Sequence, residues 1–478
     1  MEPLTWTGAL GFLTPILVIA LILLAASIVI WMLASAMSAG TRYVANADGS
    51  LSLAGNPQAM AALAVRATFG AVAAIALAYL VLGLIMGTGA GIIGAISQQM
   101  WPTWVALLLL FSLSIKFKRR LGLYGKLFDS PIGMIGFGLV MFWVFTGVFG
   151  AMDLIATHDP LAQVSGMKNK VPGTPLRSVE DGEYAWYLLG GDNLARDVFS
   201  RMVKGAWEVL KYAPLATLFA FMVGITLGLP AGYYGGKLDT FLSFLANLIL
   251  AFPVILLFYL LVTPEIVATG LPQYMAVVLF AFPMVFCGVL IHSRFRTQPS
   301  KNAFWLALVL VPMVLMYMSL INAEGSKIAF WPLDFFDIPG GVLVVFVSVV
   351  FVNSPTVFRI VRGLALDIKT RDYVAAAQTR GERPWYIMLW EILPNVRGPL
   401  IVDFCLRIGY TTILLGTLGF FGLGLPPESP DWGSTINDGR KLLSIYLHPA
   451  LPPAIALMSL VLGLNLLADG LREESLRD

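Results

Sequence analysis

The residues of this chain that could do chemistry are few and scattered. Its three histidines, His158, His292 and His448, are far apart and lie in loops or at the ends of apolar segments. Both cysteines, Cys287 and Cys405, lie inside apolar runs, where a thiol usually behaves as a small apolar group. These positions favour ordinary polar and packing roles, so we expect no metal site in this chain.

The motifs of nucleotide hydrolysis are also absent. No Gly-x-x-x-x-Gly-Lys-Ser/Thr occurs, because both Gly-Lys pairs, at Gly125 and Gly236, continue with Leu. Neither His-Glu-x-x-His nor a convincing nucleophile triad is present. We therefore expect a non-catalytic protein without a cofactor of its own, so that any ATP and Mg²⁺ would be bound by a partner.

Few ionisable residues interrupt the apolar segments. Asp403 and Arg407 are four residues apart, which places them on one face of a helix. Charges near a membrane helix often face a partner or a pathway. We favour an internal ion pair between these two side chains, and expect Glu208 and Lys211 to lie at a membrane interface.

Composition places these residues in a membrane protein. The chain has 478 residues, of which 58% are hydrophobic and only 12% charged, and its net charge of +3 gives no support for nucleic-acid binding. Apolar segments of roughly 18 or more residues, the length that crosses a bilayer as a helix, recur along it. We predict an all-α polytopic fold with eleven transmembrane helices, at 9–37, 68–96, 102–116, 132–152, 207–231, 241–263, 274–292, 303–321, 340–358, 398–420 and 450–468.

Basic residues orient these segments, since they accumulate in cytoplasmic loops. Three segments are basic: 116–126, 292–301 and 359–397, the last with seven Lys or Arg against four Asp or Glu. Alternation places all three in the cytoplasm and puts 153–206, 323–339 and the N-terminus outside. We also expect Gly224 and Gly228 to mark a close helix approach, and Phe252-Pro253 and Phe282-Pro283 to bend helices.

The stretch RDYVAAAQTRGERPWYIMLWEILPN, at Arg371–Asn395, is too polar to span a membrane and is patterned as two short helices. Its three alanines favour a first helix, and Gly381 stands where a C′ glycine would end it. Pro384 suits the first turn of a second helix, which pushes Arg383 out of the α region. Pro394 should close this second helix.

In this second helix, Trp385, Ile387, Met388 and Leu389 should lie beside the membrane. Two short helices joined by a sharp turn form a rigid body, which can transmit motion from a soluble partner. Pattern alone leaves a second interpretation equally open, in which an interfacial helix pair merely ties two spans together.

The stretch resembles the EAA coupling loop of ABC importer permeases, and more narrowly that of the C-type permease subunit of dipeptide/oligopeptide ABC transporters. Further similar stretches follow in the family's order: Gly190–Ala206, Leu227–Asp239, Leu250–Pro253, Gly419–Gly433 and Asn465–Glu473. The resemblance implies that the loop docks into a groove of an ATPase subunit. The residues that would form this coupling site are Tyr373, Ala375, Ala376, Ala377, Gly381, Glu382, Ile387, Leu393 and Pro394.

Two positions depart from the family pattern. Ala375 stands where the family usually has the glutamate that names the motif, so no salt bridge to an ATPase is expected there. Arg380, Glu382 and Arg383 would supply polar contacts instead. Ala195 replaces a glycine of the external GxDxxGRD pattern, and we expect that turn to be helical here.

The resemblance also divides the chain. It implies a six-helix type I importer permease core at 131–478, with a periplasmic segment at 153–206 and a cytoplasmic coupling loop at 365–397. Residues 1–130 would add three accessory helices, and 265–339 would insert two more. Whether these additions lie at the periphery or contact another subunit stays open.

We thus predict a permease subunit of an ATP-binding-cassette importer in the bacterial inner membrane, forming half of a pathway for a peptide or peptide-like solute. The resemblance implies a second related permease, two ATPase subunits or domains and an extracytoplasmic solute-binding protein as partners, with the coupling loop and the C-terminus in the cytoplasm. The alternative is a stand-alone secondary transporter or channel for a small polar solute. That class usually carries midplane ionisable residues and broken helix repeats, which we do not find in the sequence.

Overall fold

The structure is a computed structural model that describes residues 2–37, 43–45, 51–53, 57–120, 122–155, 158–179, 184–321, 340–423 and 429–475. Helices dominate these residues, and the strands are confined to two short pairs, which confirms the all-α prediction. The chain divides into two compact units. The first contains residues 1–102, 155–158 and 163–199, and the second contains 103–154, 159–162 and 200–478.

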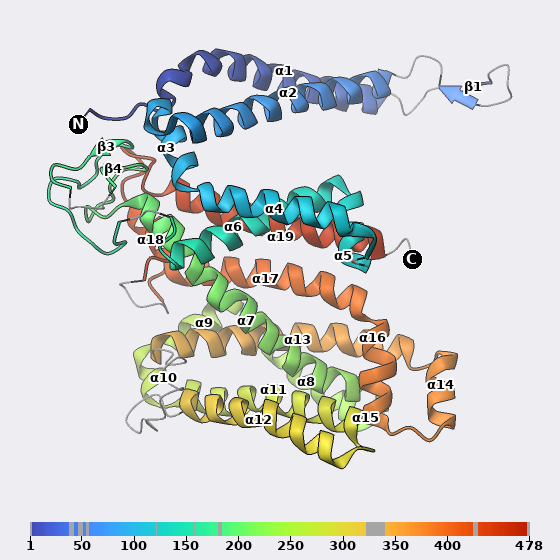
Figure 1. Cartoon of the computed structure of the whole chain (residues 1–478). Coiled ribbons are helices and arrows are strands. Elements are labelled where there is room, and N and C mark those ends of the chain that lie inside the picture. The colour runs from blue at the N-terminus through green and yellow to red at the C-terminus, as the bar shows by residue number, and fades with distance from the viewer. Residues whose placement is uncertain are drawn as a thin grey trace. The chain divides into compact units, whose positions relative to one another are not determined.

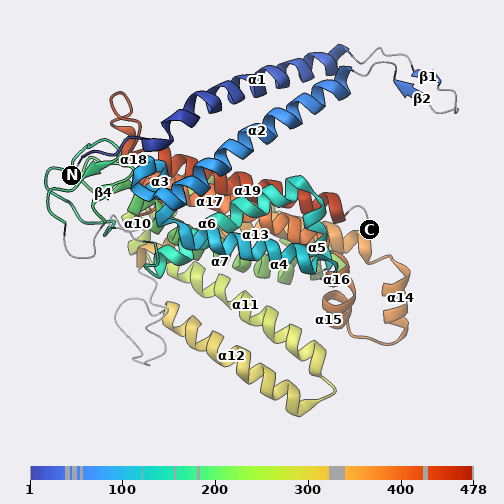
Figure 2. The same cartoon turned by 45° about the horizontal axis from the view of Figure 1, so that its top comes forward.

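The first unit is built on a long helix pair. Its helices are η1 (Gly8–Phe12), α1 (Leu13–Met37), α2 (Pro57–Met86), η3 (Gly87–Ala90) and α3 (Gly91–Gln99), and its strands are β1 (Tyr43–Ala45), β2 (Leu51–Leu53), β3 (Thr174–Pro175) and β4 (Trp186–Tyr187). Helices α1 and α2 lie side by side (Figure 1, Figure 2). Leu10 and Tyr79 form the centre of a small cluster between them.

The N-terminal residues of this unit are hydrogen-bonded to the segment at 163–199. The Leu4 amide donates to the Gly173 carbonyl at 2.9 Å, and the Trp186 indole N–H donates to the Glu2 carbonyl at 3.2 Å. The Ile92 amide at the start of α3 donates to the Thr5 carbonyl at 2.9 Å. The N-terminus and residues 163–199 therefore lie on the same side of the membrane, as charge counting predicted.

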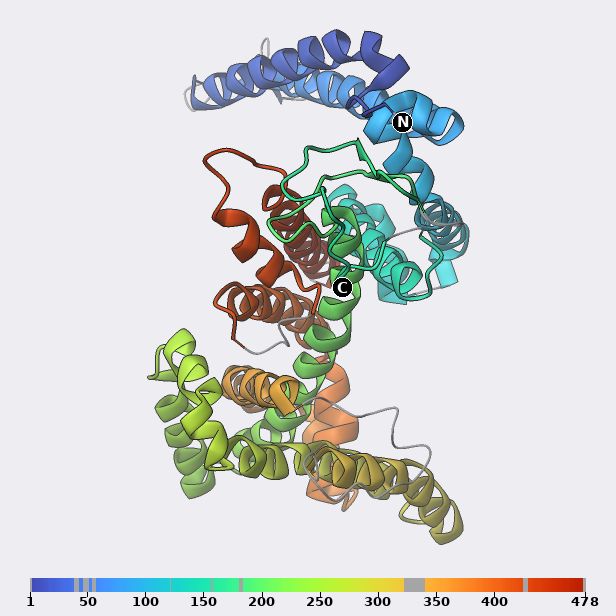
Figure 3. The same ribbon diagram turned by 90° about the vertical axis from the view of Figure 1, so that its left-hand side faces the viewer.

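The second unit contains the remaining helices. They are α4 (Trp101–Phe117), η4 (Lys118–Arg120), α5 (Gly122–Lys126), η5 (Leu127–Asp129), α6 (Pro131–Ala151), α7 (Val198–Tyr234), α8 (Gly236–Leu250), α9 (Val254–Val262), α10 (Pro264–Ala268), α11 (Leu271–Phe295), α12 (Pro299–Ile321), α13 (Gly340–Ile368), α14 (Asp372–Thr379), α15 (Pro384–Tyr386), η7 (Ile387–Ile392), α16 (Leu393–Asn395), α17 (Arg397–Phe420), α18 (Trp432–Arg440) and α19 (Leu451–Ser475). Helix α13 lies end-on among α7, α8, α9 and α11 in Figure 3. Its residues 342–350 are buried throughout.

Within the described residues, nine helices are long and apolar enough to cross a membrane, and α8 with α9 would make a tenth as one bent span. The bend between α8 and α9 is 81° and falls at Ala251-Phe252-Pro253, which confirms the kink expected at Phe252-Pro253. Helix α11, by contrast, runs on through Pro283. The predicted span at 303–321 coincides with α12, whose apolar stretch of Pro299–Leu315 is shorter than a full span. The total of eleven spans therefore stays a prediction.

Helices α7 and α13 approach closely through a row of glycines, as predicted for Gly224 and Gly228. A Cβ atom at Gly228 would lie 2.9 Å from the Phe358 carbonyl oxygen, and one at Gly224 would lie 2.5 Å from Val357 Cγ1. Gly232 continues the row one turn further on. Glycines spaced four residues apart let the two backbones touch, because no side chain separates them.

The three basic segments gather at one end of the second unit. Segment η4–α5, the turn between α11 and α12 and the α14–α16 region all lie at the right-hand end in Figure 1, whereas α10 and α18 lie at the other end. The clustering matches the prediction that these segments share one side of the membrane. The predicted external loop at 323–339 lies outside the described residues.

Candidate functional site

The first arm of the candidate coupling site is α14, and its end is a complete Schellman motif. The Glu382 amide donates to the Ala377 carbonyl at 3.2 Å, and the Gly381 amide donates to the Gln378 carbonyl at 2.9 Å. Gly381 has a φ of +76° and no atom within 4 Å of where a Cβ would lie. This position therefore favours glycine for its left-handed backbone and not for lack of space. The predicted C′ role of Gly381 is confirmed.

The second arm begins at Pro384, as predicted. Arg383 is extended, with φ −73° and ψ 150°, and Pro384 occupies the first turn of α15. The helix then widens into the π-helical turn η7 before α16 ends at Asn395, one residue after Pro394. Pro394 has no N–H to donate in an α-helical ladder and its ring crowds the preceding turn. A π turn directly before it relieves this conflict, and the sequence analysis did not anticipate that turn.

The inner face of both arms is buried in the protein. Val374 and Ala377 of α14, and Ile387, Met388 and Ile392 of η7, are at most 1% exposed. They form one hydrophobic cluster with residues of α7, α13 and α17, including Leu229, Val361 and Leu400. That Trp385, Ile387, Met388 and Leu389 lie beside the membrane stays a prediction. Ile387, Met388 and Leu389 are buried against the chain's own helices. The loop is thereby fixed to the spans.

Polar contacts tie the arms to each other and to α7. Arg380 Nη2 lies 2.8 Å from Glu391 Oε1, which joins the first arm to the second. The side-chain amide of Gln378 donates through Nε2 to the Tyr233 hydroxyl at 3.1 Å, which connects α14 to the end of α7. The arms and the end of α7 are therefore held as one body.

The nine predicted site residues divide by exposure. Ala377 and Ile387 are buried, and Glu382 and Leu393 are half-buried. The exposed set is Tyr373, Ala375, Ala376, Gly381 and Pro394. Only this exposed set presents a full surface to a partner, so Ala377 and Ile387 are anchors within the loop.

The similar stretch at Leu227–Asp239 supports the helix that leads into the loop. Arg362 of α13 pairs with the Asp239 carboxylate, with Nη2 donating to Oδ2 at 2.6 Å. Lys369, one residue past the end of α13, donates to the Gly232 carbonyl at 3.0 Å. The end of α13 that leads into the loop is thus bonded to both α7 and α8.

Two other stretches meet at the opposite end of the second unit. Arg201 of α7 is fully buried, and its Nε donates to the Thr435 hydroxyl at 3.0 Å. The Trp432 indole N–H donates to the Met202 carbonyl at 2.8 Å. Asp431 caps α18 by accepting from the Ser434 amide at 2.9 Å, and burial raises the pKa of its carboxyl above the ordinary value. The sequence motifs identified both stretches, but nothing in the sequence indicated that Arg201 bonds one to the other.

In the first unit, the turn at Ala195 corrects the sequence analysis. Ala195 has a φ of +64°, so the turn is left-handed and not helical. Asp192 holds it, because its Oδ1 accepts from the Leu194 amide at 2.8 Å and from the Arg196 amide at 2.9 Å. Arg196 Nε adds a bond of 2.7 Å to Asp192 Oδ2. These contacts outweigh the strain that a Cβ brings to this backbone region.

Both pairs of charged residues that the sequence analysis singled out in the spans form ion pairs. Arg407 Nε lies 3.3 Å from Asp403 Oδ2, with both side chains about 15% exposed or less, as the four-residue spacing predicted. Lys211 Nζ lies 2.9 Å from Glu208 Oε1. Paired charges of this kind serve helix packing, so the internal-pair interpretation of Asp403 and Arg407 is confirmed.

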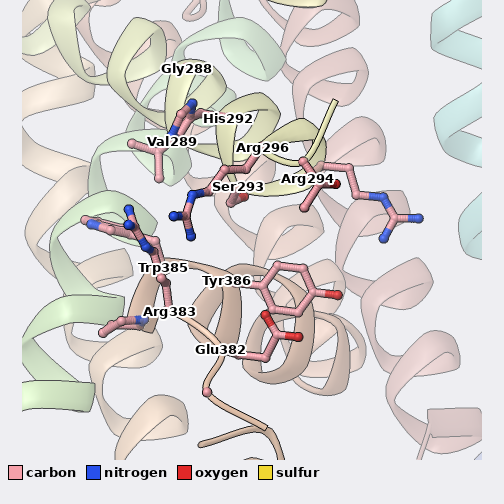
Figure 4. A pocket seen from close by; sticks show the side chains of 13 residues that line it. Gly288, Val289, His292, Ser293, Arg294, Arg296, Glu382, Arg383, Trp385 and Tyr386 are labelled. Atoms are coloured by element: carbon pink, nitrogen blue, oxygen red, sulfur yellow. The ribbon is translucent and has the colours of Figure 1, made fainter. Parts of the chain in front are cut away.

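Helix α11, from the segment interpreted as an insertion, contacts the candidate coupling site. The Trp390 indole N–H donates to the Ser293 hydroxyl at 3.0 Å, and the Arg294 guanidinium stacks 4.9 Å from the centre of the Trp390 ring. Between α11 and the turn of the loop lies a cavity of about 660 Å³ (Figure 4). The insertion is therefore not only peripheral, and this contact gave no signal in the sequence.

Comparison with known proteins places this architecture. The glutathione transport system permease protein GsiD of Pectobacterium atrosepticum is 28% identical over 295 residues, covering 62% of this chain and 74% of that protein. The dipeptide transport system permease protein DppC of Alkalihalophilus pseudofirmus is 28% identical over 320 residues, covering 67% and 80%. The DppC of Haemophilus influenzae is 27% identical over 287 residues, covering 60% and 72%.

Residues 224–473, which include the candidate coupling site and four of the six predicted core spans, match a family described as "Binding-protein-dependent transport system inner membrane component". The match covers more than half of the chain and confirms the resemblance that the motifs indicated. The chain is accordingly a multi-pass transport component and not an enzyme. It belongs to the family of binding-protein-dependent transport system inner membrane components.

Proposed function

We propose that this chain is the permease subunit of an ATP-binding-cassette importer and forms half of a translocation pathway for a peptide or peptide-like solute. A second, related permease completes the pathway, and a solute-binding protein delivers the solute from outside. ATP and Mg²⁺ bind to two ATPase subunits or domains below the loop. The dipeptide and glutathione permeases among the similar proteins support this solute class.

The observation that carries the proposal is the anchored loop. Its outer face presents small residues, Ala375 and Ala376, beside the exposed Tyr373. Its inner face is packed into a cluster shared with α7, α13 and α17. A push on the outer face therefore moves three spans together, since packed interiors transmit displacement and do not absorb it.

Charge supports the orientation. The three basic segments cluster at the same end of the second unit as this loop, and such segments are retained in the cytoplasm. The coupling loop and the C-terminus accordingly face the cytoplasm, where the ATPase is located.

A bulky substitution on the outer face tests the docking role. Ala376 is exposed, so Ala376→Trp leaves the anchored face intact while adding a large obstacle to a close contact. We expect the ATPase to be lost on co-purification and transport to fall at least tenfold, with normal membrane insertion. Ser300→Trp, exposed in the first turn of α12, is the matched control and should behave as wild type. An Ala376→Trp protein that retains its ATPase and transports normally would contradict the proposal.

A further inference from the structure

The cavity between α11 and the coupling loop has walls from two elements. The last turns of α11 supply Val289, His292, Ser293, Arg294 and Arg296, and the turn of the loop supplies Gly381–Tyr386. In Figure 4 the residues from the end of α11 lie on one side of the opening and those of the loop's turn on the other. Trp390, which follows the turn in the sequence, contacts Ser293 and Arg294, so the two walls are connected directly.

Positive charge predominates in this cavity. Arg296 and Arg383 line it and are exposed, and neither forms an ion pair with any residue that the structure describes. Glu382 is the single carboxylate in the lining, against the guanidinium groups of Arg294, Arg296 and Arg383. Guanidinium groups bind phosphate through paired N–H donors, so the cavity favours an anionic oxygen ligand.

The other walls are apolar. Val289, Pro384, Trp385 and Tyr386 line the cavity beside the arginines. A ligand that fills it must therefore present both an anionic group and an apolar part.

One face of α11 continues the cavity into the membrane. Val278, Val285, His292 and Arg296 recur at spacings of seven, seven and four residues, which places them along one side of the helix. Val278 is 60% exposed and Val285 is 48% exposed. An apolar, uncovered stripe within a membrane-length helix thus ends at the basic cavity. This is the arrangement that a phospholipid needs, with its chains on the stripe and its phosphate at the arginines.

We propose that this cavity binds the phosphate headgroup of an anionic phospholipid from the leaflet on the coupling-loop side, with Arg296 and Arg383 as its phosphate contacts. The lipid bridges α11 and the turn at Gly381, so its occupancy reinforces the joint between the insertion and the loop. Basic pockets between membrane helices are known to recognise anionic headgroups. The inference requires the membrane location of the chain and does not require its transport activity.

The test measures lipid binding to the purified full-length protein by native mass spectrometry. Phosphatidylglycerol and phosphatidylcholine of equal chain length, and inorganic phosphate, are titrated against wild type and Arg296→Gln/Arg383→Gln. Each arginine near a membrane surface contributes roughly fivefold in affinity, so the double variant should bind phosphatidylglycerol about 25-fold more weakly. Its binding of phosphatidylcholine should not change.

Two controls separate the outcomes. Lys301→Gln removes a nearby exposed charge that does not line the cavity and should bind phosphatidylglycerol nearly as wild type does. The single variant Arg296→Gln, about fivefold weaker, repeats the test on a less altered protein. Equal binding of the two lipids, or wild-type affinity in the double variant, would overturn the proposal. Inorganic phosphate that binds as tightly as phosphatidylglycerol would overturn the lipid as the source of the phosphate.

Discussion

At the scale of single residues, Gly381 and Ala195 show how much a backbone angle decides. Both are left-handed, with φ +76° and +64°, yet one is glycine and the other is not. Gly381 closes a motif made of main-chain bonds alone, so only its φ selects the residue. Ala195 is held in place by the Asp192 carboxylate, which compensates for its strain.

A valine at Gly381 isolates the effect of this angle. Gly381→Val should cost more than about 1 kcal/mol locally, because a β-branched side chain is strained at positive φ. We expect faster amide exchange over 372–386 and weaker ATPase binding. Gly363→Val is the matched control, since Gly363 also has no atom within 4 Å of a Cβ but lies in helix α13. Similar exchange in both variants would show that the turn does not depend on φ.

The same residues mark what sequence could predict. The backbone conformations of Gly381, Arg383 and Pro384 were predicted correctly, because each depends on local geometry. Gly381 needs a positive φ, and the ring of Pro384 clashes with a helical Arg383. Arg201 and Trp390 were not, because their partners lie more than 90 positions away in the sequence. Ala195 was misread because its side chain suggested a helix while a neighbouring carboxylate determined the turn.

At the scale of elements, the close approach of α7 to α13 links the spans to the loop. The glycine pattern indicated a close contact in advance, but not its partner helix. The π turn η7 was equally hidden, since it reflects a compromise between Pro394 and the burial of Ile387 and Ile392.

A larger residue in this contact should separate the two helices. Gly228→Leu forces a side chain against the Phe358 carbonyl, and overpacking of this kind costs about 1–3 kcal/mol. We expect a lower thermal unfolding midpoint in detergent together with loss of transport. Gly70→Leu on α2, where a Cβ has no atom within 4 Å, should leave the midpoint near that of wild type. A Gly228→Leu midpoint equal to that of Gly70→Leu would contradict the close contact.

At the scale of the whole molecule, charge counting and the contacts agree on which segments share a side of the membrane. The N-terminus is bonded to the 163–199 segment within the first unit, and the basic segments cluster within the second. The all-α fold followed from composition, because lipid leaves the backbone few other solutions. The contact of α11 with the coupling loop did not, since it depends on packing between distant helices.

Labelling in intact cells tests this topology. Cysteines introduced at Glu2 and Lys168 should react with a membrane-impermeant maleimide added from outside. Cysteines at Ser300 and Ala376 should react only after the inner membrane is permeabilised. The native Cys287 and Cys405 lie in membrane helices and give the background, which the unsubstituted protein measures. External labelling at Ser300 or Ala376 would reverse the proposed orientation.

We propose that the outer face of the coupling loop, at Ala375 and Ala376, touches the ATPase. A maleimide photocrosslinker attached at Ala376→Cys, in membranes that contain the assembled transporter, tests it most directly. We expect a crosslink to the ATPase from Ala376 and from Ala375, and none from the control position Ser300. Crosslinks to lipid alone from both alanines, with the ATPase captured from Ser300 instead, would contradict it.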